Sequence, residues 1–406
     1  MTLTENISRE ETRNRTENIE GNTMVLTEEV ERSLRNPAEE TERSPRNPAE
    51  EAERSPRDPD QEMERSSQDP AEEAGRNARN LAEEIIAGRR LKEGEPAVQC
   101  LLTSKVDTLC QAADRIRAAF SGDHVDLCTI INGKSGRCSE DCKYCAQSIH
   151  SKTGCETYAF LDEETILHAA MFNERAGVSR FSIVTSGRTL EGESFEKAVR
   201  SFERLNRECR IELCASMGLL SEAQFRRLRA VGVKRCHNNI ESSRNFFPHI
   251  CTTHGFDQKL NAIRAAQRAG MSVCSGGIIG MGESWQDRID MAFTLASLGI
   301  RSIPLNVLIP VPGTPFQDRT PLSEEEVLRT VALFRFINPE ADIRLAGGRK
   351  TLRDNGRLAF SSGASAAITG DMLTTTGSSV ARDRAMLTEI GRDVTPEWMR
   401  NAASAT

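Results

Sequence analysis

Residues 125–148 have the sequence VDLCTIINGKSGRCSEDCKYCAQS, and this stretch decides the expected fold. Its first seven residues are a short apolar run, which is typical of a buried β-strand. Glycine and charged residues follow, and then three cysteines, Cys138, Cys142 and Cys145, within eight residues. Parallel β/α folds carry reactive side chains in loops of this kind, at the carboxyl ends of their strands. The stretch therefore predicts the first strand of a parallel sheet and the loop that bears its site.

Apolar runs alternate with helical patterns over the rest of the chain. The eight expected strands cover residues 125–131, 180–185, 210–215, 233–240, 272–279, 302–308, 342–345 and 364–369. Helical patterns lie between them, and several start at good capping residues, such as Asp162, Ser221 and Ser323. Eight strand–helix units in about 270 residues predict an α/β protein with a (β/α)8 TIM-type barrel. A doubly wound open sheet is the alternative fold.

The N-terminal segment has the composition of a chain that does not fold. An 11-residue unit repeats through it, as in ERSPRNPAEEA from Glu42, and the first aromatic residue of the chain is Phe120. An 11-residue period can form a right-handed coiled coil, but the prolines of the repeats exclude helix and no apolar seam is present. We therefore expect four segments: a disordered tail at 1–76, a helical lead-in at 77–120, the barrel at 121–395 and a C-terminal tail at 396–406.

Charge and cysteine content exclude several classes of protein. Residues 1–90 carry a net charge of −9, which leaves +2 for the rest of a chain whose total is −7. A nearly neutral body lacks the basic face that nucleic-acid binding requires. No apolar run approaches the roughly 18 residues of a membrane span, and the N-terminus resembles neither a signal nor a transit peptide. We expect a cytoplasmic protein whose twelve cysteines are mostly reduced, and whose clustered cysteines bind metal or act in catalysis.

The Cys-x3-Cys-x2-Cys spacing of the loop indicates an iron–sulfur cluster. A loop this short can hold three corners of a cubane cluster, whose irons normally bind four cysteines. The open fourth iron can then chelate a small molecule, which with this spacing is usually S-adenosylmethionine. The alternative is a zinc knuckle in which His150 is the fourth ligand. The place of the loop after a barrel strand favours the cluster.

With this loop, the sequence resembles radical S-adenosylmethionine enzymes, and within them the biotin synthase family, over residues 95–395. Six further motifs carry the resemblance: LCASMGLLSE around Cys214, HNNIESS from His237, VCSGGIIGMGES around Cys274, IPLNVLIPVPGTP around Asn306, IRLAGGR around Arg344 and GDMLTTTG from Gly370. Some of them are weak signals alone. The GGIIGMGE stretch, for example, could be taken for a phosphate loop, but it closes a fifth strand instead of opening a first βαβ unit. Their order and spacing together make the resemblance specific.

The resemblance implies a sulfur-inserting enzyme with two iron–sulfur clusters. Cys138, Cys142 and Cys145 would hold a 4Fe-4S cluster that reduces bound S-adenosylmethionine to methionine and a 5′-deoxyadenosyl radical. That radical would remove hydrogen from unactivated carbons of dethiobiotin, which acid–base groups cannot do, and an auxiliary cluster would supply the sulfur. A small electron-donor protein of the flavodoxin or ferredoxin type and a homodimer are implied as well.

The auxiliary cluster departs from the family pattern in one ligand. The pattern matches Cys214, Cys274 and Arg344, but Ser182 stands where a cysteine is expected on the second strand. Cys128 stands on the first strand, where the better-known members carry serine. Neighbouring inward-facing residues of a barrel lie close together, so Cys128 is a candidate for the missing ligand; a small buried packing residue is the alternative. The auxiliary cluster is of the 2Fe-2S or the 4Fe-4S type.

Further residues are expected in the binding pocket from the same resemblance. Asn239 and Asn306 match positions that face dethiobiotin, and Glu241 stands where an aspartate binds the ribose of S-adenosylmethionine. Tyr144 and Ile278 resemble contacts to adenine. The alternative for the polar residues is a satisfied core or capping role. The remaining cysteines are expected to be structural: Cys100, Cys110, Cys155, Cys209, Cys236 and Cys251.

Two other functions remain open beside sulfur insertion into dethiobiotin. A related radical enzyme acting on another small substrate is favoured if the change at Ser182 prevents an auxiliary cluster. A non-catalytic iron–sulfur or zinc protein is favoured if S-adenosylmethionine is not cleaved. Lipoyl synthase, another sulfur inserter, fits poorly because its additional N-terminal cysteine cluster does not occur in this sequence.

Overall fold

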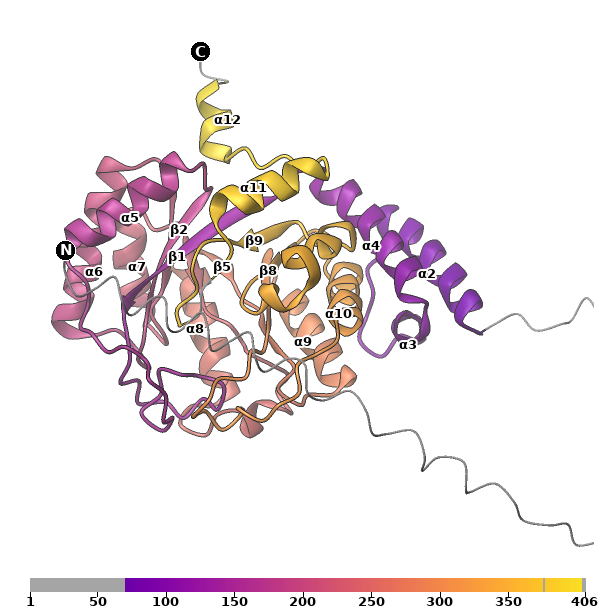
Figure 1. Ribbon diagram of the computed structural model, residues 1–406, viewed down its shortest axis with the longest axis horizontal. Helices are drawn as coiled ribbons and strands as arrows, with labels where there is room; N and C mark the ends of the chain where they lie inside the picture. Colours follow the sequence, from indigo (N-terminus) through magenta and orange to yellow (C-terminus); the bar gives the residue numbers. More distant parts are fainter. Residues whose placement is uncertain (1–69, 375–376, 404–406) are drawn as a thin grey trace, which may run out of the picture. The chain divides into compact units, whose positions relative to one another are not determined.

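The barrel expected from the sequence is present in the computed structural model, which describes residues 70–374 and 377–403 (Figure 1). All strands of the described chain run parallel in one sheet, in the order β5-β4-β3-β2-β1-β9-β8-β7-β6, and β5 also pairs with β7, which closes the ring. The strands are β1 (Asp126–Lys134), β2 (Arg180–Thr185), β3 (Glu212–Ser216), β4 (Arg235–His237), β5 (Ser272–Cys274), β6 (Gly277–Ile279), β7 (Ser302–Val307), β8 (Asp342–Leu345) and β9 (Ala366–Ile368). The open-sheet alternative is therefore excluded.

The fifth barrel strand is interrupted, so that β5 and β6 are its two pieces. Ser275 and Gly276 separate the pieces, whereas the sequence predicted one continuous strand over 272–279. A Cβ atom on Gly276 would lie 1.9 Å from the carbonyl oxygen of Pro304 on β7. Only glycine allows the two backbones to approach this closely. Because of the interruption, β7, β8 and β9 are the sixth, seventh and eighth strands of the barrel.

Helices cover the outside of the barrel between successive strands (Figure 1). They are α5 (Glu163–Arg175), α6 (Gly192–Glu208), α7 (Glu222–Ala230), α8 (Phe256–Arg268), α9 (Trp285–Ser297), α10 (Glu324–Ile337) and α11 (Val380–Glu389), with short 3-10 helices at Phe247–His249, Arg349–Thr351 and Arg353–Ser361. The predicted caps are confirmed. The side chains of Asp162, Ser221 and Ser323 each accept a hydrogen bond from a backbone N–H in the first helical turn.

Side chains alternate along each strand between the surrounding helices and the interior of the barrel. The odd-numbered Leu127, Phe181 and Ile183 are fully buried in the core beneath the helices. The even-numbered Cys128 and Ser182 line a cavity inside the barrel instead. The same parity holds on β3, where Leu213 belongs to the core. Any polar residue at an even position of these strands therefore faces the interior.

Three helices precede the barrel: α2 (Pro70–Ile86), α3 (Pro96–Thr103) and α4 (Val106–Ser121). Helix α2 starts six residues before the expected end of the disordered tail at 76, and the rest of that expectation, residues 1–69, lies outside the described residues. Proline is well tolerated in the first helical turn, and buried apolar residues recur at helical spacing after it: Ala74, Ala78, Leu81, Ala82 and Ile85. The expected C-terminal tail at 396–406 also contains a helix, α12 (Glu397–Ala403). None of the described helices is long and apolar enough to cross a membrane.

Candidate active site

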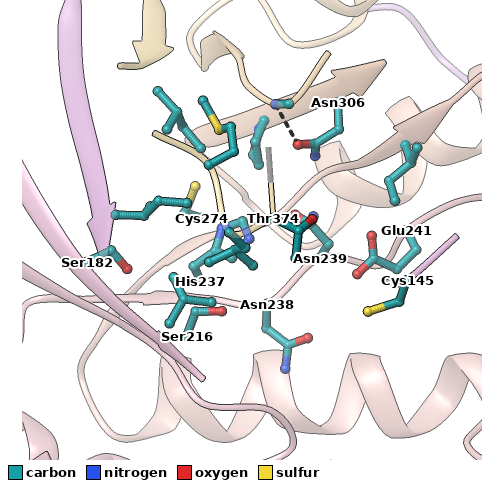
Figure 2. A pocket seen from close by; sticks show the side chains of 18 of the residues that line it. Cys145, Ser182, Ser216, His237, Asn238, Asn239, Glu241, Cys274, Asn306 and Thr374 are labelled. Carbon is teal, nitrogen blue, oxygen red and sulfur yellow. Dashed lines mark hydrogen bonds between the residues drawn. The ribbon is translucent and has the colours of Figure 1, made fainter. Parts of the chain in front are cut away.

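A cavity of about 420 Å³ lies inside the barrel and opens among the loops that follow the strands. In Figure 2, Cys145 and Glu241 lie on one side of this cavity, Ser182 lies on the other, and His237 and Cys274 lie between them. The predicted site residues that line it are Cys128, Cys138, Tyr144, Cys145, Ser182, Cys214, Asn239, Glu241, Cys274, Ile278, Asn306 and Arg344. Cys142 is not among the lining residues. The structure thus gathers nearly all the predicted site residues around one space.

The cysteine loop closes on itself at the mouth of the cavity. The backbone N–H of Cys138 donates to Gln147 across 3.0 Å, and the N–H of Ile149 donates back to the carbonyl of Cys138 across 2.9 Å. The side chain of Gln147 also accepts from the N–H of Gly136, whose φ is 73°. These bonds hold Cys138 and Cys145 against the cavity without help from a regular secondary structure.

The thiols of this loop are not arranged for a single ion. Histidine, cysteine, aspartate and glutamate side chains can bind a metal ion. Among the residues that the structure describes, only Cys142, Cys251 and His254 form a group of three or more such side chains with all ligand atoms within 4.8 Å of one another. The loop cysteines do not form such a group, and His150 does not join them. Its ring Nε2 faces the carbonyl of Ser139 at 3.3 Å instead. This geometry disfavours the zinc knuckle.

A second group of thiols lies deeper in the barrel, on alternate strands. Cys128, Cys214 and Cys274 belong to the first, third and fifth barrel strands, and Arg344 belongs to the seventh. Side chains inside such barrels form layers, and each layer takes its members from alternate strands. These four residues have the strand pattern of one layer. Ser182 is on the second strand, so by the same rule it belongs to the adjacent layer.

A buried carboxylate holds three arginines at the bottom of the cavity. Asp126 accepts from Arg344 across 2.6 Å and from Arg180 across 3.0 Å, and its Oδ2 lies 3.7 Å from Arg235. Burial alone would raise the pKa of Asp126, but the three guanidinium groups hold it well below its ordinary value. The same carboxylate raises the pKa of Arg344, against the effect of burial, so the guanidinium stays protonated.

Hydrogen bonds and the positive charge of these arginines favour the thiolate forms of two cysteines, Cys214 and Cys274. Burial would raise the pKa of Cys274, but a hydrogen bond from His237 and the charge of Arg344 lower it to about 6. A hydrogen bond from Cys128 lowers the pKa of Cys214 to about 7. The thiol of Cys128 keeps its proton, because that hydrogen bond and burial both raise its pKa. Iron binds thiolates, so this layer contains ligands that lose their protons readily.

Ser182 has a different environment. It pairs in register with Cys214 on β3 and Ile130 on β1. Its hydroxyl oxygen is buried and has no hydrogen-bond partner. A buried hydroxyl without a partner is unusual in proteins and points to a group that is absent from the structure.

The predicted binding residues at the mouth form hydrogen bonds in and around the segment that interrupts the fifth strand. Asn239 Oδ1 accepts from the N–H of Gly276 across 3.0 Å, and Glu241 donates its N–H to the Gly276 carbonyl across 3.1 Å. Ile278 donates its N–H to Glu241 across 2.9 Å, and Asn306 Nδ2 donates to the carbonyl of Gly277 across 3.1 Å. Part of the hydrogen bonding of Asn239 and Asn306 is therefore structural, which was the alternative interpretation of these residues.

Glu241 has the features of a ligand-binding residue. Its φ of 68° is in the left-handed region, which is strained for any residue except glycine. Its Oε2 is buried without a hydrogen-bond partner, while Oε1 lies 3.7 Å from the ammonium of Lys259. Tyr144 stays protonated nearby, because burial and then the charge of Glu241 raise its pKa. A polar ligand at this position would satisfy the free carboxylate oxygen.

Sequence reasoning missed three cationic residues that line the cavity: Arg180, Arg235 and Lys259. Two of them could have been found from strand parity. Arg180 is two residues from Ser182, and Arg235 is two residues from His237, so each faces the interior together with its neighbour. Lys259 is in the first turns of α8, and no pattern in the sequence indicated that it reaches the cavity.

Comparison with known proteins connects this geometry to a family. Residues 134–295 match the Radical SAM superfamily, and residues 304–393 match the Biotin and Thiamin Synthesis associated domain. The biotin synthase of Alkaliphilus metalliredigens is 54% identical over 76% of this chain and 96% of its own length. The chain belongs to the biotin synthase family. The biotin synthase of Clostridium beijerinckii is 53% identical over 76% of the chain and 97% of its own length.

Solved structures support the fold of this biotin synthase family member. Methylornithine synthase has a TM-score of 0.68 at 19% identity and covers 80% of this chain and 99% of its own. The FeFe-hydrogenase maturase HydG from Carboxydothermus hydrogenoformans has a TM-score of 0.62 at 17% identity and covers 79% and 81%. The radical SAM family of the barrel implies a 4Fe-4S cluster with S-adenosylmethionine. The unpartnered carboxylate oxygen of Glu241 at the mouth of the cavity fits a polar ligand such as S-adenosylmethionine.

Proposed function

We propose that this protein is a biotin synthase, which inserts sulfur into dethiobiotin by radical S-adenosylmethionine chemistry. One observation carries the proposal: a single cavity joins a loop of cysteines at its mouth to a layer of three cysteines at its base. Sulfur insertion requires a source of radicals and a source of sulfur on either side of one substrate. When bound, the two cofactors supply a radical that removes hydrogen from unactivated carbons and the sulfur that replaces it.

The mouth of the cavity would hold the 4Fe-4S cluster and S-adenosylmethionine. Cys138, Cys142 and Cys145 would bind three irons and leave the fourth to the methionyl group. Glu241 would accept hydrogen bonds from the ribose hydroxyls, because its free oxygen has no partner within the protein. Tyr144 and Ile278 would contact the adenine. These residues bind and orient the cofactor, and the closed barrel beneath them excludes water.

Dethiobiotin would lie between the two thiol groups. Each amide nitrogen of Asn239 and Asn306 carries two hydrogens, and Asn306 uses one of them on the carbonyl of Gly277. Asn306 Oδ1 also accepts from the N–H of Gly347 across 2.9 Å (Figure 2). Both side chains are thus held in place by backbone groups, with amide hydrogens left to donate to the ureido carbonyl of the substrate.

The auxiliary cluster would be bound by Cys128, Cys214 and Cys274. The strand pattern of these residues supports this ligand set, because members of a barrel layer come from alternate strands. Ser182 stands at the position of the family's second-strand ligand, in register with Cys214, but a serine hydroxyl must lose a proton at far higher cost than a thiol. Two neighbouring thiols, Cys214 and Cys274, already have lowered pKa values. The nuclearity of this cluster, 2Fe-2S or 4Fe-4S, is to be measured by spectroscopy.

Arg344 would lie beside the auxiliary cluster as a cation. Its guanidinium donates to Asp126 Oδ2 across 2.6 Å and to the carbonyls of Asp126 and Ala367 across 2.9 and 3.0 Å. These acceptors favour the protonated form, and a protonated guanidinium donates hydrogen bonds but has no lone pair for a metal. We therefore propose that Arg344 stabilises the negative charge of the thiolates.

Anaerobic reconstitution of the full chain with iron and sulfide tests the function. The expected result is iron and sulfide for two clusters, and biotin and 5′-deoxyadenosine on addition of dethiobiotin, S-adenosylmethionine and a reductant. Cleavage of S-adenosylmethionine without biotin, at an iron content of one cluster, would overturn the proposal. That outcome would favour a related radical enzyme with another small substrate.

We also propose three properties of the working enzyme. A small electron-donor protein of the flavodoxin or ferredoxin type would reduce the cluster at the mouth. The enzyme would work in the cytoplasm, where its twelve free cysteines stay reduced. It would be a homodimer, which light scattering at micromolar concentration tests directly.

A further inference from the structure

Cys142 lies beside two metal-binding side chains, Cys251 and His254, that the proposed reaction does not use. Its sulfur, the sulfur of Cys251 and a ring nitrogen of His254 are within 4.8 Å of one another. Cys251 and His254 come from the segment that follows the 3-10 helix Phe247–His249, and both are buried. Cys251 was expected from the sequence to be merely structural. Its position beside Cys142 and His254 makes it a candidate metal ligand.

A carboxylate orients the histidine of this group. Glu140 Oε2 lies 2.5 Å from His254 Nδ1, and the two side chains are 7% and 5% exposed. Metal-binding histidines commonly donate one ring N–H to a carboxylate and present the other nitrogen to the metal. In that tautomer, His254 presents Nε2. The sulfur of Cys251 is 3.9 Å from Nε2 and 3.2 Å from Nδ1. Bonds of about 2.0 Å to nitrogen and 2.3 Å to sulfur separate two ligands of one tetrahedral zinc by a similar distance.

Backbone contacts hold the two segments together around the group. Asp141 accepts from the N–H groups of Thr252 and Thr253 across 2.8 and 3.2 Å. The sulfur of Cys251 lies 3.2 Å from the same carboxylate. Because Asp141 is the neighbour of Cys142 in the chain, these contacts fix the distance between Cys142 and Cys251. The ligands are therefore held in position before any ion binds.

We propose that Cys142, Cys251 and His254 form a second metal site, which binds one soft divalent cation such as Zn²⁺ when the loop holds no cluster. Two thiols and an imidazole are the donors that zinc prefers. The two thiols release two protons as they bind, so two thiolates balance the charge of the ion. A water molecule or a carboxylate oxygen of Glu140 or Asp141 completes the tetrahedron.

The site and the 4Fe-4S cluster exclude each other, because both require Cys142. Zinc bound here removes one of three loop cysteines from cluster assembly. The inference thus predicts that zinc inhibits loading of the loop. It does not depend on the reaction catalysed by the loaded enzyme.

Cobalt is the probe for this site, because Co²⁺ reports its ligands by absorption. The full chain, freed of iron anaerobically, is expected to bind one Co²⁺ with tetrahedral d–d bands and thiolate charge-transfer bands, and one equivalent of Zn²⁺ should displace it. Cys251→Ser and His254→Ala should each weaken Co²⁺ binding more than 10-fold. Glu140→Gln should weaken it about 10-fold, as loss of a carboxylate behind a histidine ligand does. Cys209→Ser, at the end of α6, is the matched control and should bind as the parent does.

Iron uptake then tests the competition. Zinc-loaded parent protein should reconstitute with less iron than zinc-free protein, whereas Cys251→Ser should take up iron equally with and without zinc. Normal iron uptake by Cys251→Ser also verifies that this variant folds. Unchanged Co²⁺ binding in both Cys251→Ser and His254→Ala would overturn the inference. So would an equal loss in Cys138→Ala and Cys145→Ala, because the loop cysteines alone would then hold the ion.

Discussion

Arg344 donates a hydrogen bond to the carboxylate of Asp126 across 2.6 Å, between the first and seventh strands of the barrel. Both side chains are almost completely buried, at 2% and 7% exposed. Arg180 donates to the same carboxylate from the second strand. Asp126 thus connects three strands beneath the cavity, and its removal would leave the buried guanidinium of Arg344 without its ion-pair partner.

We predict that Asp126→Asn destabilises the protein by about 3–5 kcal/mol, as loss of one partner from a buried ion pair does. Urea denaturation of the apoprotein measures the change. Asp257→Asn is the control, because Asp257 pairs with Arg244 at the surface, where both side chains are mostly exposed. That variant should have nearly the stability of the parent, because exposed ion pairs contribute little to folding. Equal losses in the two variants would show that Asp126 has no special structural role.

The two groups of cysteines should differ in what their removal abolishes. Alanine at Cys138, Cys142 or Cys145 should abolish reductive cleavage of S-adenosylmethionine, because two thiolates cannot retain a cubane cluster with an open corner. Cys214→Ala should still form 5′-deoxyadenosine but no biotin. Chromatography of both products in one assay distinguishes the variants. Loss of cleavage in all four variants would contradict the division into two sites.

Cys128→Ala and Ser182→Ala test the ligand set of the auxiliary cluster. Cys128→Ala should lose the iron and sulfide of one cluster and all biotin formation, and it should retain cleavage of S-adenosylmethionine. Ser182→Ala should keep both clusters and most of its activity. Mössbauer spectra of the variants and the parent decide between them. Full iron content in Cys128→Ala and reduced content in Ser182→Ala would make the serine hydroxyl the ligand.

Two N-terminal deletions should differ in their effect on stability. Removal of residues 1–66 should leave the melting temperature and activity nearly unchanged, because the composition of this segment provides no core residues. Removal of residues 1–86 should lower the melting temperature by several degrees, because it deletes the buried Leu81 and Ile85 of α2. Thermal denaturation measures both. A comparable loss in the shorter deletion would show that the segment before α2 stabilises the barrel.

Local patterns were sufficient to predict most of the barrel. The second and seventh strands match their predicted ranges, 180–185 and 342–345, because each is a short apolar run with three consecutive buried residues. The fourth strand was predicted over 233–240 but covers only Arg235–His237. The residues that follow it, Asn238 and Asn239, line the cavity instead of continuing the sheet. The interruption at Gly276 depends on the approach of another strand, which no local pattern contains.

The same limit applies to the candidate site. Cys128, Cys214 and Cys274 could be predicted to face inward, because their positions follow strand parity. The contact of Glu140 with His254 joins residues 114 positions apart, and only the packing of two loops determines it. Sequence reasoning accordingly left Cys251 as a structural residue.

Gly276 gives the mouth of the cavity a common point of attachment. Asn239 and Glu241 are bonded directly to its backbone, and Ile278 and Asn306 are bonded one step away. The proposed contacts to two different molecules, the adenosyl donor and the sulfur acceptor, therefore move as a unit. We expect a displacement of this glycine to shift both sets of contacts together. Because Asn239 and Asn306 make these attachments with their side chains, a substitution at either position would change the anchoring of the rim together with the contacts to the acceptor.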